Sequence, residues 1–196
     1  MTMDRATEIA IAADRAALLV VDVQDKLAAV MPPDDMARLT RNVAILCEAA
    51  RRFAIPVVVS QQYPRGLGPT VEGVEKALAG LPGERLHRFD KVEFSVCAAP
   101  DFAAVEQRLD GRDQWIVTGM ECHICVYQSA RALRAGGAAV HVVRDAVISR
   151  TPENRDVGLA LIERAGALIT TTETVVFDLL QRAGSDDFKA LSRLIV

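Results

Sequence analysis

The sequence predicts a three-layer α/β/α fold built on a mainly parallel, doubly wound sheet of six strands. Short runs of β-branched and other apolar residues alternate with segments of helical periodicity along the 196 residues. Glycine and proline residues punctuate the boundaries between them. Repeated strand–helix alternation calls for a parallel sheet with helices on both faces. Since no linker, internal repeat or low-complexity tract interrupts the pattern, residues 1–196 are predicted to form one domain.

The first half of the chain supplies three of the strands. Residues 17–23 (ALLVVDV) are a near-continuous apolar run, as expected for a strand buried on both faces of a parallel sheet. A helix is predicted over residues 32–53, where Pro33 suits the first turn and apolar residues recur at helical spacing. The remaining elements are a strand at 55–60, a Gly/Pro-rich loop at 61–70, a short helix around 71–79 and a strand near 85–90.

The second half continues the alternation. The predicted elements are a helix opened by Pro100, a strand at 114–119, a helix at 125–137, a strand at 138–146, a helix at 152–166, a strand at 167–172 and two terminal helices. Ligands of such sheets bind outside the carboxyl ends of the strands. The residues that directly follow each strand are therefore the first candidates for a functional site.

Composition restricts the class of function. Hydrophobic residues make up 51% of the chain, charged residues 25%, and the net charge is -3. This balance is ordinary for a globular protein and argues against a nucleic-acid partner, which usually meets a basic surface. The N-terminus has no apolar core long enough for a signal peptide, and no segment approaches a membrane span. We expect a soluble cytoplasmic protein with a small-molecule substrate and no membrane partner.

Two charged residues lie at predicted strand ends. Asp22 closes the first apolar run, where an acid is costly to bury without a partner; the alternative is a helix cap or a solvated turn. Lys91 follows the strand at 85–90 beside Asp90 and Glu93, so a surface ion pair is its ordinary explanation. Either residue alone is weak evidence of a site.

The segment IVTGMECHICVYQSARALRAGG (116–137) carries the strongest signal. A strand runs into a glycine, then a short turn, then a helix, and Cys125 falls at or near the first helical turn. A helix N-terminus favours a thiolate and lowers the pKa of a cysteine. The alternative is a small buried hydrophobe. Because α/β hydrolases hold their nucleophiles at strand–turn–helix junctions, we predict that Cys125 is a nucleophile.

Cys122 and Cys125 also form a CxxC sequence. A structural zinc site needs a second ligand pair, whereas the other two cysteines are isolated and His87 and His141 stand alone. A thioredoxin fold would place the motif after an early strand. We therefore predict no metal, no cofactor and four free thiols, and keep a redox switch through Cys122 and Cys125 as an alternative.

Three ordered motifs resemble the isochorismatase-like cysteine hydrolases. They are LLVVDVQ (18–24), DKVEFSVC (90–97) and TGMECHICVYQSA (118–130), and RDAVISR (144–150) resembles a later strand end of the family. The similarity covers nearly the whole domain. QYPRGLG (62–68) is similar to the loop of the isochorismatase-domain-containing subgroup.

The resemblance implies a mechanism. By position, Asp22 would be the general base, Lys91 the cation beside it and Cys125 the nucleophile. The family's cis peptide would join Met120 to Glu121 and help aim backbone N–H groups into an oxyanion hole. The implied reaction is hydrolysis of a small amide, imide or related acyl bond. Nicotinamidases carry an Asp-x-His metal motif after the second strand; SQQYPRG has neither residue, so metal-dependent chemistry is not expected.

The resemblance also implies a homo-oligomer, a dimer or larger. Gln24, Gln62 and Tyr63 are candidates to line the substrate pocket, with ordinary loop polarity as the alternative. Phe94 is a candidate apolar wall or a core residue. The apolar segment 188–196 packs either on a neighbouring copy or on its own domain. A different class of function stays open: a catalytically silent oligomeric interaction protein with a relict site.

Overall fold

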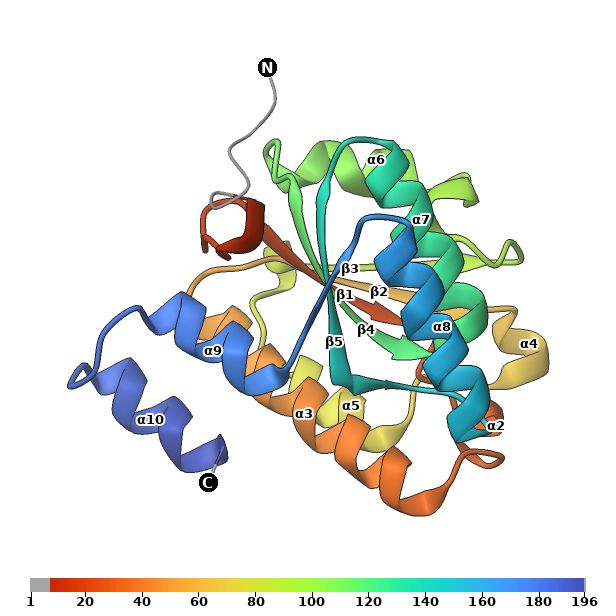
Figure 1. Cartoon of the computed structure of the whole chain (residues 1–196), viewed down its shortest axis with the longest axis horizontal. Coiled ribbons are helices and arrows are strands. Elements are labelled where there is room, and N and C mark those ends of the chain that lie inside the picture. Colours follow the sequence, from red (N-terminus) through yellow and green to blue (C-terminus); the bar gives the residue numbers. More distant parts are fainter. Residues whose placement is uncertain (1–7, 196) are drawn as a thin grey trace.

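A single parallel sheet of six strands forms the centre of the computed structural model, which describes residues 8–195 (Figure 1). The strands are β1 (Ala16–Val21), β2 (Val57–Gln62), β3 (Leu86–Lys91), β4 (Gln114–Met120), β5 (Ala139–Ile148) and β6 (Leu168–Thr170). Their order is β3-β2-β1-β4-β5-β6, and every pair is parallel. The chain winds outward from β1 through β2 to β3, and then crosses back to β4. The predicted doubly wound sheet is confirmed.

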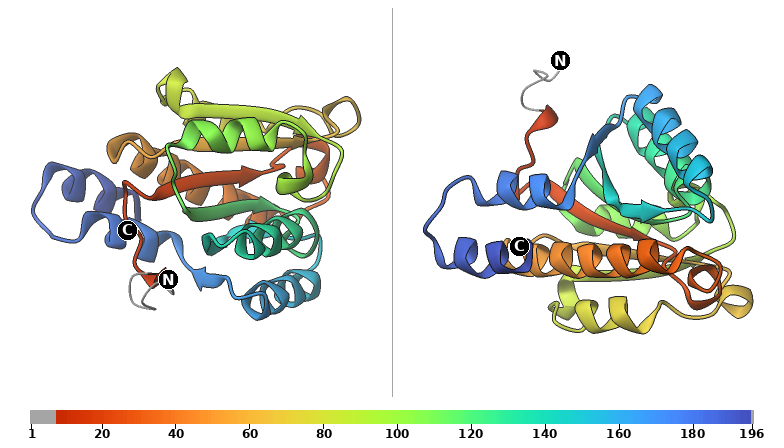
Figure 2. Two further views of the ribbon diagram at one scale, coloured as in Figure 1. Left: turned by 90° about the horizontal axis from the view of Figure 1, so that it is seen from above. Right: turned by 60° about the horizontal axis from the view of Figure 1, so that its bottom comes forward.

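Helices cover both faces of this sheet (Figures 1 and 2). They are α2 (Asp25–Ala28), α3 (Pro33–Arg52), α4 (Pro64–Leu67), α5 (Glu72–Leu78), α6 (Phe102–Glu106), α7 (Tyr127–Ala135), α8 (Pro152–Arg164), α9 (Thr172–Leu180) and α10 (Asp186–Ile195). Buried residues of α3, α5, α9 and α10 share one hydrophobic cluster. Those of α6, α7 and α8 share a second cluster on the other face. The predicted three layers are therefore present.

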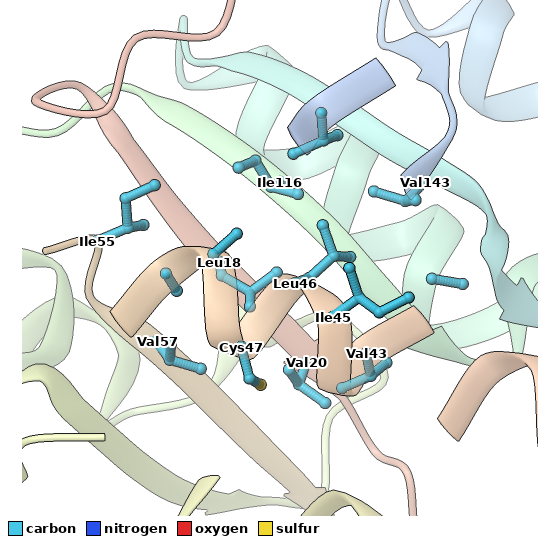
Figure 3. Close-up of a cluster of buried hydrophobic side chains, with 14 of the residues drawn as sticks. Leu18, Val20, Val43, Ile45, Leu46, Cys47, Ile55, Val57, Ile116 and Val143 are labelled. Carbon is cyan, nitrogen blue, oxygen red and sulfur yellow. The ribbon is translucent and has the colours of Figure 1, made fainter. Parts of the chain in front are cut away.

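The apolar run of β1 explains its central place. Leu18 and Val20 belong to the α3 cluster, whereas Leu19 and Val21 belong to the α7 cluster. Successive side chains of a strand point to opposite faces, so a strand covered on both faces needs apolar residues at every position. Figure 3 shows Leu18 and Val20 packed with Leu46 of α3.

Helix α3 follows its sequence signals closely. Pro33 occupies its first position, and Asp34 and Asp35 lie in its first turn, where the helix dipole favours acidic side chains. The residues at helical spacing, including Leu39 and Val43, are completely buried.

Several boundaries differ from the sequence-based expectation, among them those of β2, α6 and α7. Strand β2 runs two residues further than predicted, to Gln62, because it keeps pairing with β3. The helix after Pro100 is short, because a 3-10 turn (Gln107–Leu109) follows α6. The helix predicted at 125–137 begins as a π-helical turn, Cys122–Val126, before α7 starts at Tyr127.

The terminal helix packs on its own domain. Leu191 of α10 is completely buried in the α3 cluster, and Phe188 packs against it. The last residue of the predicted apolar segment, Val196, lies outside the described residues, as do the first seven residues of the N-terminal segment. In the part of the chain that the structure describes, no helix has the length and apolarity to cross a bilayer.

Candidate active site

The carboxyl ends of β1, β3 and β4 bring the predicted catalytic residues to one edge of the sheet. Asp22 directly follows β1, Lys91 ends β3, and Cys125 follows β4. Lys91 Nζ lies 2.6 Å from Asp22 Oδ2, and both side chains are 0% exposed. Asp22 is therefore not a solvated turn residue, and Lys91 does not form a surface ion pair.

The Lys91 ammonium is surrounded by oxygen atoms. Besides Asp22, it donates to Gln62 Oε1 at 2.7 Å and to the backbone carbonyls of Glu93 and Phe94 at 3.2 and 3.3 Å. A buried ion pair is tolerated only when additional hydrogen bonds satisfy its remaining donors and acceptors. Here one carboxylate oxygen and three neutral oxygens accept hydrogen bonds from the Lys91 ammonium.

The Asp22 carboxylate is held through both oxygens. Ser60 Oγ donates to Oδ1 at 2.7 Å, and Lys91 holds Oδ2. The backbone of Asp22 has φ 51°, a left-handed conformation that Asp tolerates better than most residues. Its N–H still donates to Ser60 O at 3.1 Å. Ser60 was not among the predicted site residues; its only sequence signal is a hydroxyl directly after the three valines of β2.

The turn that carries Cys125 is tightly folded. A cis peptide bond joins Met120 to Glu121, at the position that the family resemblance implies. The Glu121 carbonyl accepts from the N–H groups of Ile124 at 3.0 Å and Val126 at 3.3 Å. The second bond spans five residues and closes the π-helical turn. Cys125 therefore lies within this turn rather than in the first turn of α7.

Two glycines allow close backbone approaches to the turn. Gly119 has φ +115°, and a Cβ there would lie 2.1 Å from Val21 O of the neighbouring strand. A Cβ on Gly158 of α8 would lie 2.8 Å from the His123 backbone nitrogen. Both contacts are closer than a side chain permits, so β1 and α8 fix the turn from two sides.

Side-chain hydrogen bonds attach the same turn to the end of β5. The Glu121 carboxylate, 5% exposed, accepts from Arg150 N and from Arg150 Nε, each at 3.0 Å. His123 Nδ1 lies 2.9 Å from Ser149 Oγ. The sequence signal for these partners was the RDAVISR segment, although it did not reveal their contacts.

The Cys125 thiol is in its protonated form at neutral pH. Its pKa is raised to about 12, mainly by burial and then by the nearby Asp22 charge, while Lys91 acts in the opposite direction. A hydrogen bond with Asp22 also favours the thiol. The expectation of a lowered pKa is therefore wrong for the resting state, because burial and the Asp22 carboxylate outweigh Lys91.

All four cysteines are free. Burial raises the pKa of Cys47 and of Cys122 to about 12, and that of the half-buried Cys97 to about 11. Cys122 Sγ lies 3.6 Å from Arg155 O, so this thiol contacts the backbone of α8.

Of the four predicted substrate contacts, Gln24 and Gln62 are buried. Gln24 Nε2 donates to the carbonyls of Gln62 at 3.0 Å and Gly68 at 2.7 Å, and Gln24 Oε1 accepts from Gln62 N at 2.7 Å. Gln62 Nε2 donates to Val92 O at 2.8 Å. Protein groups therefore occupy the polar atoms of both side-chain amides.

The other two candidates are open to solvent. Tyr63 is 55% exposed and Phe94 53%, so Phe94 is not a core residue. Tyr63 borders a surface hollow of about 420 Å³. Its lining residues are Tyr63, Pro64, Arg65, Asp90, Lys91, Val92, Glu93, Pro100 and Asp101. The hollow thus reaches Lys91, while Asp22 and Cys125 are not among its lining residues.

Within residues 8–195, no cluster of three or more His, Cys, Asp or Glu side chains is arranged to hold a metal ion. The predicted absence of a metal and of a cofactor stays a prediction.

Comparison with known proteins places this geometry in a family. Residues 16–174 match the model of the isochorismatase domain. The chain is 33% identical over 181 residues to isochorismatase domain-containing protein 2 of Bos taurus, an alignment that covers 91% of this chain and 81% of that protein. It superposes on the MAR1 ribonuclease of Caenorhabditis elegans with a TM-score of 0.85 and 34% identity, covering 95% and 92% of the two chains.

A more distant structure shares the fold. The Escherichia coli YcaC gene product, described as an octameric hydrolase of unknown specificity, has a TM-score of 0.82 at 24% identity, and the match covers 95% of this chain and 89% of that one. The domain match spans all three strand ends that bear Asp22, Lys91 and Cys125. Together with the one-third identity to the bovine relative, this match shows that the chain belongs to the isochorismatase family of hydrolases.

Proposed function

We propose that this chain is a metal-independent cysteine hydrolase of a small amide, imide or related acyl compound. The observation that carries the proposal is the buried Asp22–Lys91 pair, which lies near enough to Cys125 for both charges to act on its thiol. Burying two charges is costly, and an apolar pair often serves stability as well or better. A cysteine placed on such a pair favours a catalytic role.

Asp22 is the general base in this mechanism. As the Cys125 sulfur attacks the substrate carbonyl carbon, the thiol proton passes to the Asp22 carboxylate. The C–S bond forms, and the carbonyl π electrons move to oxygen. Proton transfer leaves the net charge of the three side chains unchanged, because one anion replaces another beside the Lys91 ammonium. A pre-formed thiolate is therefore unnecessary, and the raised pKa of Cys125 is consistent with the mechanism.

The turn before Cys125 supplies the oxyanion site. The backbone N–H groups of Glu121 and Cys125 are our candidates to bind the tetrahedral oxyanion, and the Met120–Glu121 peptide sets their direction. Removal of one such donor typically costs about 3–4 kcal/mol of transition-state stabilisation.

Collapse of the tetrahedral intermediate completes the first half-reaction. The oxyanion electrons re-form the carbonyl, the bond to the leaving nitrogen breaks, and protonated Asp22 gives its proton to that nitrogen. Water then attacks the Cys125 thioester with Asp22 as base, releasing the acid and restoring the thiol.

Surface exposure divides the predicted substrate contacts. We assign Tyr63 and Phe94 to the substrate or its entrance, because both side chains are open to solvent at the site edge. Gln62 instead holds Lys91, and Gln24 holds the Gln62 backbone, because the amides of both side chains already have protein partners. We also propose a homo-oligomer, since the Escherichia coli YcaC protein of the same fold is an octamer.

Loss of either reacting group tests the function directly. In a panel of small amides, imides and esters, Cys125→Ala and Asp22→Asn should abolish any turnover found, while their circular dichroism stays that of wild type. Cys97→Ala, which removes a half-buried thiol outside the site, is the matched control and should retain activity. Full activity in Cys125→Ala would end the mechanism.

The panel should separate the remaining functions. No turnover of any acyl substrate, with no adduct on Cys125 by intact mass, supports a silent interaction protein. Labelled RNA belongs in the panel because the Caenorhabditis elegans protein is named a ribonuclease; we expect no cleavage. A Cys122–Cys125 disulfide after mild peroxide, seen by non-reducing mass analysis, would support the redox switch.

A further inference from the structure

Strand β2 separates the two strands that carry the ion pair. Asp22 follows β1 and Lys91 ends β3, and β2 lies between them. Neighbouring strands lie about 4.8 Å apart, so the Lys91 side chain must cross β2 to reach Asp22. Gln62 is paired with Lys91 in the register of β2 and β3. The crossing therefore takes place over the Gln62 side chain.

Gln62 points to the face of the sheet that holds Cys125. Val58 of β2 belongs to the same buried cluster as Cys125, whereas Val59 belongs to the opposite cluster. Side chains alternate along a strand, so Ser60 and Gln62 share the Cys125 face, while Gln61 lies on the other face.

Three hydrogen-bonding groups fix the orientation of Gln62. Its Nε2 donates to Val92 O at 2.8 Å, which leaves Oε1 to accept from Lys91 Nζ at 2.7 Å. The Gln24 amide holds the Gln62 backbone by accepting from its N–H and donating to its carbonyl. A reversed Gln62 amide would set an NH₂ group against the ammonium, so the neighbours permit only the observed orientation.

Asp22, Lys91 and Gln62 form a cluster whose net charge is zero only because Gln62 is neutral. Asp22 and Lys91 cancel each other, and Gln62 contributes an acceptor oxygen without a charge. Lys91 is the cation that favours the ionised form of Cys125 against burial and against the Asp22 charge. An acid at position 62 would partly neutralise Lys91 and leave this cluster with a net negative charge.

We propose that Gln62 is a positioning residue: its amide oxygen holds the Lys91 ammonium across β2 without adding charge, so that the full field of Lys91 acts on Cys125. This inference rests on the proposed function. The inference also extends that function, because it gives Gln62 a role in the proton transfer. The sequence had made Gln62 a candidate substrate contact.

The test compares two isosteric substitutions in adjacent residues. Gln62→Glu and Gln61→Glu change the net charge equally, but on opposite faces of β2. The rate of Cys125 alkylation by iodoacetamide would be followed by peptide mass spectrometry at pH 7, 8 and 9. At pH values below the pKa, raising the thiol pKa by one unit lowers the fraction of thiolate about tenfold. We expect Gln62→Glu to slow alkylation about five- to tenfold at each pH, and Gln61→Glu to stay within about twofold of wild type.

Each outcome decides the proposal. If wild-type Cys125 is reactive and its alkylation is equally fast in Gln62→Glu and Gln61→Glu, the role of Gln62 is overturned. The proposed function is then unaffected. Wild-type Cys125 that stays unreactive at all three pH values overturns this inference, and if Cys125→Ala is also fully active, the proposed function falls with it. If Gln62→Glu does not fold, Gln62→Met replaces it, which removes the acceptor without adding a charge. Slower alkylation in Gln62→Met supports the proposal, and the wild-type rate contradicts it.

Discussion

At the scale of single residues, the candidate site is defined by its hydrogen-bond partners. Both Asp22 oxygens and three further contacts of Lys91 are accounted for by named protein groups. The sequence identified Asp22, Lys91 and Cys125 because each follows a strand and matches a family motif. Ser60 could not be recognised in this way, because a lone serine at the end of a valine run carries no distinguishing pattern.

Ser60→Ala should lower both activity and stability. The substitution removes the hydroxyl that donates to Asp22 Oδ1 at 2.7 Å and leaves a buried carboxylate oxygen short of a partner. Such losses cost about 1–3 kcal/mol, measured here by urea unfolding. We expect turnover to fall by about tenfold or more.

Thr118→Val is the matched control for Ser60→Ala. It removes another buried hydroxyl, whose hydrogen bond goes to Leu19 O at 3.0 Å and not to the carboxylate. Its turnover should stay within about twofold of wild type. Equal activity losses in the two variants would remove Ser60 from the site.

The raised pKa of Cys125 predicts a loss of stability at alkaline pH. Its ordinary value is 9.0, and burial raises it to about 12 in the folded protein. As the pH rises past 9, the unfolded chain releases this proton first, so stability is complete below pH 9 and declines toward pH 12. Between pH 8 and 10, the free energy of unfolding of wild type should fall by about 1.4 kcal/mol more than that of Cys125→Ala. Parallel curves would show that the thiol does not contribute.

At the scale of elements, the order of strands and helices was predictable, but the shape of the nucleophile turn was not. Periodicity and Gly/Pro punctuation predicted all six strands, and the central ones, β1 and β4, most clearly, because a strand buried on both faces demands a continuous apolar run. The π-helical turn at Cys122–Val126 depends instead on tertiary contacts. Because Gly119 and Gly158 have no side chain, β1 and α8 can approach the turn closely. Such contacts produce no periodic pattern in the sequence.

Gly158→Ala tests whether α8 supports the nucleophile turn. Helix propensity alone would make the substitution stabilising by about 1 kcal/mol. The new Cβ, however, would lie 2.8 Å from His123 N, a backbone atom that cannot move aside without moving the turn. We expect lower thermal stability and a loss of turnover of about tenfold or more. Gly83→Ala, where no atom lies within 4 Å of the new Cβ, should leave both unchanged.

At the scale of the whole molecule, sequence and structure agree on a doubly wound α/β protein, with the candidate site at the carboxyl ends of its strands. The sequence did not predict that this edge would bear exposed apolar side chains. Tyr63 and Phe94 are more than half exposed, and Val92 is 68% exposed. They lie on adjoining loops, because Tyr63 N donates to Lys91 O at 2.8 Å. Clustered apolar exposure of this kind is typical of interaction surfaces, whereas single exposed residues are ordinary.

This surface gives the predicted homo-oligomer a testable location. Sedimentation velocity at micromolar concentration should show a dimer or a larger assembly, and a monomer would contradict the prediction. Val92→Asp should shift the distribution toward smaller species, because a buried unpaired charge is costly at an interface. Val157→Asp is the matched control, since Val157 is 52% exposed on a different element, α8. If only Val157→Asp dissociates the assembly, the subunits meet through α8, and the apolar edge remains free to admit substrate.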